Sequence, residues 1–171
     1  MKRLKTYAFV DASNIIYGAR DAGWFIDQKK LFGYLKVKYQ VKTAIFYFGK
    51  DSQNEKQAAF LEKLKKFGFV LRVKEIKRFG AKTKANCDVD LTMDALLLAR
   101  EYKRGIFLTG DGDFCPLFEY LQNKAKKVVV VIAWPHRTAR EIKKFAGENF
   151  VDMNSLRYLL ERPIKKGRTL K

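Results

Sequence analysis

Six aspartates of this 171-residue chain fall in three short motifs, and their carboxylates are the groups best suited to chemistry. The motifs are FVDASN with Asp11 and Asn14, CDVDLTMDAL with Asp88, Asp90 and Asp94, and FLTGDGDF with Asp111 and Asp113. Carboxylates that converge repel one another unless a positive charge offsets them or some of them take up protons. Mg²⁺ or Mn²⁺ is the natural partner of such oxygen ligands, and either ion can activate water for attack on a phosphate ester.

Five apolar runs predict the buried strands that position these motifs. They are Tyr7–Val10, Thr43–Phe48, Phe69–Val73, Ile106–Leu108 and Val128–Ile132. Because the runs are continuous rather than alternating, both faces of the sheet are expected to be covered. Helical patterns occupy residues 29–39, 52–67, 89–102, 114–123, 138–145 and 155–160. The alternation predicts one α/β domain over residues 1–162 with a mainly parallel central sheet, followed by a basic tail over 163–171.

Two of the acidic motifs are expected at the same edge of this sheet. Asp11 directly follows the first predicted strand, and Asp111 and Asp113 directly follow the fourth. Ligands of open parallel sheets bind beyond the carboxyl ends of the strands, where the strand order reverses. The first and fourth strands are the usual neighbours at that point, so Asp11 and Asp111 should approach each other across the crevice.

Helix geometry places the remaining motif. An apolar stripe that includes Leu91 and Ala95 should face the sheet. At about 100° per residue, Asp88 and Asp94 then border this buried face, roughly 60° to either side of Leu91. Asp90 is turned further away and can reach solvent.

Each motif also has a purely structural interpretation. Asp11 could cap a loop, and Asp88 could be an ordinary helix N-cap. Asp111 and Asp113 could be turn residues, since aspartate and glycine favour turns. The coincidence of all three motifs at one edge of a sheet favours a ligand site.

The charge balance is the strongest global signal. Lysine and arginine total 36 against 18 acidic residues, a net charge of +18. Such a field attracts polyanions, although a lysine-rich surface without a nucleic-acid partner remains the plainer alternative. A basic surface that holds a phosphodiester backbone around an acidic, metal-binding centre is the combination expected of a nuclease.

The segment 74–86, KEIKRFGAKTKAN, leads directly into Asp88 and is interpreted as a flexible, basic loop that guides the nucleic acid backbone. Its candidate phosphate contacts, with one more at the end of the second strand, are Arg78, Lys82, Lys84 and Lys50. Phe79 could stack on a base or be tucked into the core, and the sequence leaves both possibilities open. Arg137 and Arg140 are weaker candidates.

Several other activities have no support in the sequence. His136 is the single histidine and is expected to begin a helix rather than to serve as a base. Cys87 and Cys115 are expected to be core thiols, in a reducing, cytoplasmic setting. There is no GxxxxGK[ST] phosphate loop, no long apolar run that would span a membrane and no signal-peptide pattern.

The motifs FVDASN, KANCDVDLTMDAL, FLTGDGDFCPL and KKVVVVIA resemble the NYN domain family of PIN-like nucleases, over residues 7–160. The later stretch TAREIKKFAGENFVDMNSL is similar to the helix and short final strand of bacterial members. The resemblance implies a three-layer α/β/α fold and a Mg²⁺- or Mn²⁺-dependent endoribonuclease. By the same resemblance, the metal-site positions are Asp11, Asp88, Asp111 and Asp113, the amide of the first motif is Asn14, and a further helix carboxylate is Asp94. KANCD departs from the more common Lys-Gly-Val-Asp, a change that should not affect metal binding.

The leading hypothesis is therefore a metal-dependent ribonuclease that acts on RNA, with single-stranded RNA as the expected substrate. The alternative is a non-catalytic RNA-binding regulatory module with the same fold, in which the aspartates are structural. A phosphohydrolase of small nucleotides is a weaker third possibility, because it would leave the wide basic surface unused. A homodimer is compatible with the sequence.

Overall fold

A computed structural model describes residues 4–51, 53–79, 82–84 and 86–163, with the backbone alone described at 77–79 and 82–84. The strands are β1 (Thr6–Asp11), β2 (Val41–Lys50), β3 (Val70–Glu75), β4 (Lys77–Phe79), β5 (Lys82–Lys84), β6 (Arg104–Leu108), β7 (Val128–Ala133) and β8 (Phe150–Asp152). The α-helices are α1 (Ala12–Ala22), α2 (Gln28–Tyr39), α3 (Glu55–Phe67), α4 (Asp88–Leu97), α5 (Cys115–Glu119), α6 (Arg140–Ala146) and α7 (Arg157–Leu160). Short 3₁₀ or π segments extend or connect several of these helices.

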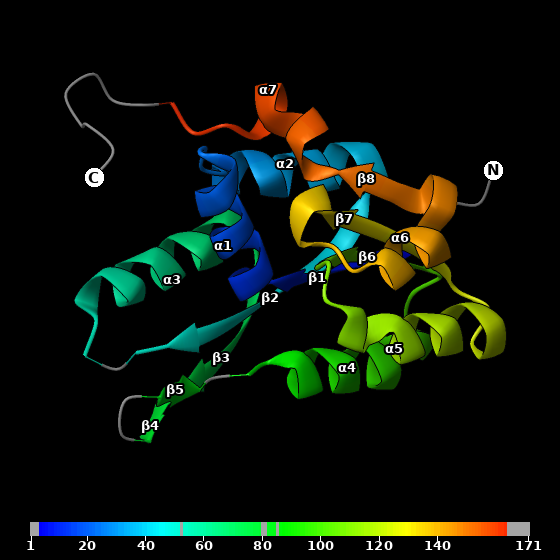
Figure 1. The fold of residues 1–171 in the computed structure, drawn as a ribbon, viewed down its shortest axis with the longest axis horizontal. Helices are drawn as coiled ribbons and strands as arrows, with labels where there is room; N and C mark the ends of the chain where they lie inside the picture. Colours follow the sequence, from blue (N-terminus) through cyan, green and yellow to red (C-terminus); the bar gives the residue numbers. More distant parts are fainter. Residues whose placement is uncertain (1–3, 52, 80–81, 85, 164–171) are drawn as a thin grey trace.

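The central sheet has six parallel strands in the order β3-β2-β1-β6-β7-β8 (Figure 1). The chain builds outward from β1 in one direction and from β6 in the other, so the strand order reverses between these two neighbours. Val10 is paired with Leu108, and the residues that follow them therefore emerge at the same level of the sheet edge. This confirms the predicted adjacency of the strands that precede Asp11 and Asp111.

Helices cover both faces of the sheet, as the continuous apolar strands predict. On one face, α1, α2, α3 and α7 pack through residues that include Ile15, Leu35, Leu64 and Leu160. On the other face, α4, α5 and α6 pack through a second cluster that includes Leu91, Phe118 and Ile142. Figure 1 shows α1 and α3 on the opposite side of the sheet from α4 and α5. The fold is thus a three-layer α/β/α domain, as expected.

One helix and one strand of the central sheet were absent from the pattern derived from apolar runs. Helix α1 begins where the Asp11 carboxylate caps the Asn14 N–H, and it ends at Gly23 in a left-handed conformation. Its buried face consists of Ala12, Ile15, Gly18 and Ala19, of which Ile15 is the one large apolar side chain. Strand β8 is a short, half-buried sixth strand, which only the family resemblance had implied.

Two helix starts also differ from the sequence prediction. Helix α3 begins at Glu55 rather than at residue 52, because the Asn54 side chain accepts a hydrogen bond from the Gln57 N–H and forms the cap. Helix α6 begins at Arg140, two residues after the expected start. Neither shift changes which face of the helix packs on the sheet.

The basic segment 74–86 is not the unstructured loop that the sequence suggested. Strand β3 runs on to Glu75, and β4 and β5 pair antiparallel as a short hairpin, with Arg78 opposite Thr83. The backbone of Arg78, Lys82 and Lys84 thus lies in regular structure. The side chains of these residues and of Phe79 lie outside the described part of the chain, as does most of the predicted basic tail, residues 164–171.

Within the described ranges, no helix is both long and apolar enough to cross a membrane.

Candidate active site

Asp11 is the most constrained carboxylate at the sheet edge. It ends β1, caps α1 and is only 8% exposed. Its Oδ1 accepts hydrogen bonds from Ser13 Oγ at 2.6 Å and from the Asn14 N–H at 3.2 Å. Its Oδ2 accepts from the Thr109 hydroxyl at 3.1 Å. The three donor groups fix the orientation of this carboxylate before any ligand binds.

Thr109 connects the first acidic motif to the third. Its hydroxyl is buried, donates to Asp11 and accepts the Asp111 N–H at 3.3 Å. Asp111 then caps the 3₁₀ turn at 112–114 by accepting the Asp113 N–H at 3.0 Å. The two motifs, far apart in sequence, form one hydrogen-bonded unit across β1 and β6.

Gly110 allows the loop between β7 and α6 to approach this unit. Its carbonyl accepts the Ala139 N–H at 2.9 Å. A Cβ at Gly110 would lie 2.9 Å from the Cα of Thr138, closer than packed atoms allow. Residues 109–112 and the start of α6 therefore form one wall of the site.

Asp88 brings the second motif to the same place. It is the first residue of α4, and its N–H donates to Asn86 Oδ1 at 2.7 Å. Burial raises the pKa of Asp88, and the negative charges of Asp11, Asp111 and Asp113 raise it further, while Asn86 opposes the shift. The charges of Asp11, Asp111 and Asp113 thus act on Asp88, although no hydrogen bond among the described residues joins it to them. The structure unites Asp11 and Asp111 through Thr109, and the gathering of all four carboxylates around one ion stays a prediction.

The donor groups suit a hard divalent cation in type, because they are all oxygen atoms. In the described part of the chain, none of the four carboxylates forms an ion pair with lysine or arginine. Asn14 adds a buried Oδ1 atom that has no hydrogen-bond partner among the described residues. However, no three acidic, histidine or cysteine side chains of those residues lie together closely enough to form a ready ligand set. A cation would have to draw the carboxylates inward.

A cavity of about 460 Å³ opens beside these groups. It is lined by Asn14, Gly110, Asp111, Gly112, His136, Arg137, Thr138 and Ala139. His136 lies in the 3₁₀ turn Pro135–Arg137, close to its expected place at the start of a helix. Arg137 also forms an ion pair with Asp21 on α1. The lining of the cavity therefore combines the carboxylate of Asp111 and the amide of Asn14 with the basic group of Arg137 and the imidazole of His136.

Asp90 and Asp94 have other partners. Asp90 pairs with Lys74 at 2.9 Å on the surface, as its predicted orientation toward solvent allows. Asp94 accepts hydrogen bonds from the Tyr47 hydroxyl at 3.0 Å and from Arg72 Nε at 2.8 Å. Burial, and then Asp94, raise the pKa of Tyr47. Asp94 is thus bound to β2 and β3, rather than directed at the other carboxylates.

Tyr47 nevertheless connects Asp94 to the site. Its hydroxyl donates to Asp94, and its backbone lies opposite Asp11 in the pairing of β2 with β1. Lys50 ends the same strand, β2, and lies at the carboxyl edge of the sheet as predicted.

The two thiols are not activated nucleophiles. Cys87 and Cys115 are free, half-buried and packed against the core below α4 and α5. Burial raises the pKa of Cys87 to about 11 and also raises the pKa of Cys115. Both residues act as the core thiols that the sequence predicted.

Thr109 and Ser13, which donate hydrogen bonds to Asp11, are not among the site residues predicted from the sequence. Each is adjacent to or within two residues of a motif aspartate, and Thr109 is a polar residue directly after an apolar strand. That position was the available signal, since a buried hydroxyl normally requires a hydrogen-bond partner.

The fold and the site define a class of protein: a three-layer α/β/α domain with carboxylates at the point where the order of parallel strands reverses. The model of the NYN domain matches residues 5–156, and the chain belongs to this family. It is 28% identical over 164 residues to the Low amplitude and bright protein LabA of Synechococcus elongatus, a match that covers 90% of this chain and 86% of LabA. The crystal structure of VPA0982, a protein of unknown function from Vibrio parahaemolyticus, has a TM-score of 0.78 and 29% identity, covering 90% of this chain and 95% of that one.

Proposed function

We propose that this protein is a Mg²⁺- or Mn²⁺-dependent endoribonuclease that hydrolyses phosphodiester bonds of single-stranded RNA. The observation that carries the proposal is the hydrogen-bonded unit that joins Asp11 to Asp111 through Thr109 at the sheet edge, where no described lysine or arginine forms an ion pair with either carboxylate. A cation is the simplest group to offset that charge. Membership of the NYN family supports the same conclusion.

Asp11, Asp88, Asp111 and Asp113 would hold the ion. When bound, the ion supplies an activated water and offsets the negative charge that develops on the phosphate oxygens. Ser13 and Thr109 keep the Asp11 carboxylate in one orientation. The buried Oδ1 of Asn14 can accept a hydrogen bond from a water or from a ligand in the cavity. Asp94 acts as a positioning residue through Tyr47.

The basic surface would hold the RNA backbone. The net charge of +18 gives the long-range attraction, and Lys50 lies at the sheet edge. The hairpin that carries Arg78, Lys82 and Lys84 leads directly into α4, and we propose that it contacts phosphates on the approach to Asp88. Residues 1–162 would form the catalytic domain, and 163–171 a basic tail.

A non-catalytic RNA-binding module is the second candidate. One observation favours it: no three acidic side chains in the described ranges already have the spacing of metal ligands. In such a module the aspartates would serve as caps, as Asp11 and Asp111 do.

A cleavage assay with single-stranded RNA labelled at the 5′ end distinguishes the ribonuclease from the non-catalytic RNA-binding module. The full chain should cut internally with Mg²⁺ or Mn²⁺ and should be inactive in chelator. Asp11→Asn and Asp111→Asn should abolish cleavage. Asp152→Asn is the matched control, because Asp152 also ends a parallel strand and caps a turn, but at the far edge of the sheet. Cleavage that persists in both site variants would overturn the proposal. RNA binding without cleavage, together with no heat of Mn²⁺ binding in calorimetry, would establish the second candidate.

A further inference from the structure

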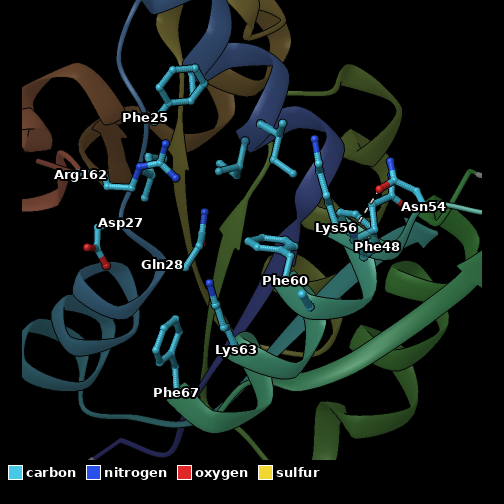
Figure 2. A pocket seen from close by; sticks show the side chains of 16 residues that line it. Phe25, Asp27, Gln28, Phe48, Asn54, Lys56, Phe60, Lys63, Phe67 and Arg162 are labelled. Atoms are coloured by element: carbon cyan, nitrogen blue, oxygen red, sulfur yellow. Dashed lines mark hydrogen bonds between the residues drawn. The ribbon is translucent and has the colours of Figure 1, made fainter. Parts of the chain in front are cut away.

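A second and larger cavity, of about 660 Å³, lies on the other side of α1 from the acidic site. Its walls come from α1, α3 and the segment that leads into α2 (Figure 2). Ile16, Phe48, Phe60 and Phe67 contribute to an apolar floor. The Phe60 ring is anchored from below by its contacts with Phe46 and Phe48. The floor therefore offers rigid aromatic surface rather than a flexible aliphatic lining.

The rim of this cavity is rich in hydrogen-bond donors. Lys56 and Lys63 come from α3, and Arg162 comes from the end of the described chain. Figure 2 shows their nitrogen atoms, with the amide nitrogen of Gln28, around the same open space. The Oε1 atom of Gln28 is buried and has no partner among the described residues, so its amide has unused hydrogen-bonding capacity.

The charge balance of the rim favours an anion. Among the described residues that line the cavity, Asp27 is the one acidic residue. Its Oδ1 accepts the N–H groups of Lys29 and Lys30 at 2.9 Å and 3.1 Å, as the cap of α2. The described lining thus contains three cationic side chains and one carboxylate, and that carboxylate already caps α2. Arg162 is held near the cavity by its N–H, which bonds to the Phe25 carbonyl at 2.8 Å, and by its guanidinium over the Phe25 ring.

We infer that this cavity binds a nucleotide, with the base on the aromatic floor and the phosphate at the lysines. The volume is in the range of small-molecule sites, and every base has a face that stacks on an aromatic ring. Lys56 and Lys63 can donate charge-assisted hydrogen bonds to phosphate oxygens. The Gln28 amide can form hydrogen bonds with donors or acceptors on the edge of the base. An acidic peptide would match the rim but would leave the aromatic floor without a flat partner.

The nucleotide has two possible sources: a free mononucleotide or one residue of an RNA strand. Asn14 lines the acidic cavity, and Ile15 and Ile16 line this one, so a single turn of α1 separates the two sites. A strand that crosses the sheet edge could therefore place a base here. The inference concerns binding alone and does not depend on cleavage at the aspartates.

Isothermal titration calorimetry on the full chain tests the inference. The titrants are AMP, GMP, CMP and UMP, a single-stranded RNA oligonucleotide, the corresponding nucleosides, inorganic phosphate and a polyglutamate peptide. Lys63→Gln should weaken nucleotide binding by roughly fivefold, as expected for loss of a partly exposed ionic contact. Lys66→Gln is the matched control, because Lys66 is on the same helix but does not line the cavity. Lys63→Arg should restore most of the affinity.

The outcomes distinguish a free mononucleotide from a residue of an RNA strand. They also keep this inference separate from the function of the acidic site. Binding of mononucleotides that depends on Lys63 identifies a free-nucleotide site, and dependence seen only with RNA identifies a strand subsite. The readout is the difference in binding between Lys63→Gln and Lys66→Gln, so a failed nuclease assay does not affect this test. The inference is overturned if neither nucleotides nor RNA distinguish Lys63→Gln from Lys66→Gln. It is also overturned if the peptide alone binds through Lys63.

Discussion

The hydroxyl of Thr109 lies 3.1 Å from Oδ2 of Asp11, in a buried hydrogen bond between residues 98 positions apart in the sequence. The same hydroxyl accepts the Asp111 N–H. One threonine therefore sets the relative position of the first and third acidic motifs. The candidate site depends on this contact as much as on the carboxylates themselves.

Replacement of Thr109 by valine should destabilise the fold and disturb the site. Valine has a similar shape but leaves Asp11 Oδ2 and the Asp111 N–H without this partner. We expect a loss of about 1–3 kcal/mol in the free energy of unfolding, the usual cost of buried polar groups left unsatisfied. Urea unfolding measures it. Thr109→Ser keeps the hydroxyl and should recover most of the loss, whereas equal stability of the valine variant and wild type would contradict the assigned role.

Asp88 should make the protein less stable as the pH rises. Burial and the neighbouring carboxylates raise its pKa in the folded chain above the ordinary 3.8. The unfavourable contribution of Asp88 to the free energy of unfolding is absent at low pH, where its carboxyl is protonated in both the folded and the unfolded chain. It begins as the pH rises past the ordinary pKa, where Asp88 of the unfolded chain ionises, grows up to the raised folded pKa and is complete above it. Asp88→Asn should therefore be more stable than wild type at pH 7, with a difference that shrinks toward pH 4 in urea unfolding.

Asp90→Asn is the control for this pH dependence. Asp90 is on the same turn of α4 but pairs with Lys74 in solvent. Its replacement should not stabilise the protein at pH 7.

Mn²⁺ should also raise the melting temperature of wild type and of Asp90→Asn but not that of Asp88→Asn. A stabilised Asp90→Asn would show that net charge, rather than the site, explains the effect.

Asp94 should matter for stability more than for cation binding. Asp94→Ala leaves the mostly buried Tyr47 hydroxyl without its partner and releases Arg72. We expect a loss of about 1–3 kcal/mol in the free energy of unfolding. Calorimetry should show that Mn²⁺ affinity falls far less than in Asp11→Asn. An equal loss of Mn²⁺ binding in the two variants would mean that Asp94 is itself a ligand.

Gly110→Ala should weaken the contact between the third motif and α6. The added Cβ meets the backbone of Thr138, so we expect a loss of about 1–3 kcal/mol, typical of overpacking. Gly33→Ala is the control, because a Cβ there meets nothing within 4 Å inside helix α2. That change should stabilise the protein by about 0.5–1 kcal/mol. Thermal or urea unfolding distinguishes the two directions, and similar effects at both positions would contradict the packing argument.

Much of the fold could be predicted because its signals are local. The apolar runs identify five of the six sheet strands, and their continuity predicts helices on both faces. The position of Asp11 after β1 and of Asp111 after β6 then follows from chain order and from the usual place of strand reversal. Helix periodicity also predicts the burial of Leu91 and Ala95.

Helix α1 is an element that the local sequence pattern did not predict. Gly18 lies against the Trp134 ring, where no larger side chain would fit, so the helix buries a small residue at a position that apolar periodicity does not register. The cap that starts the helix is the same Asp11 that serves the site. The hairpin of β4 and β5 was missed because two strands of three residues carry no clear alternation.

The amino-acid sequence by itself determines the α/β class, the burial of the strands and the acidic character of one sheet edge, since these depend on residue type and on spacing along the chain. The tertiary structure alone decides which partners each aspartate has: Asp11 is joined to Asp111 through Thr109, whereas Asp94 is held by Arg72. Those partners come from different strands and helices. Ion pairs and buried hydrogen bonds depend on distances of a few ångströms, and packing sets such distances, not the order of residues in the chain.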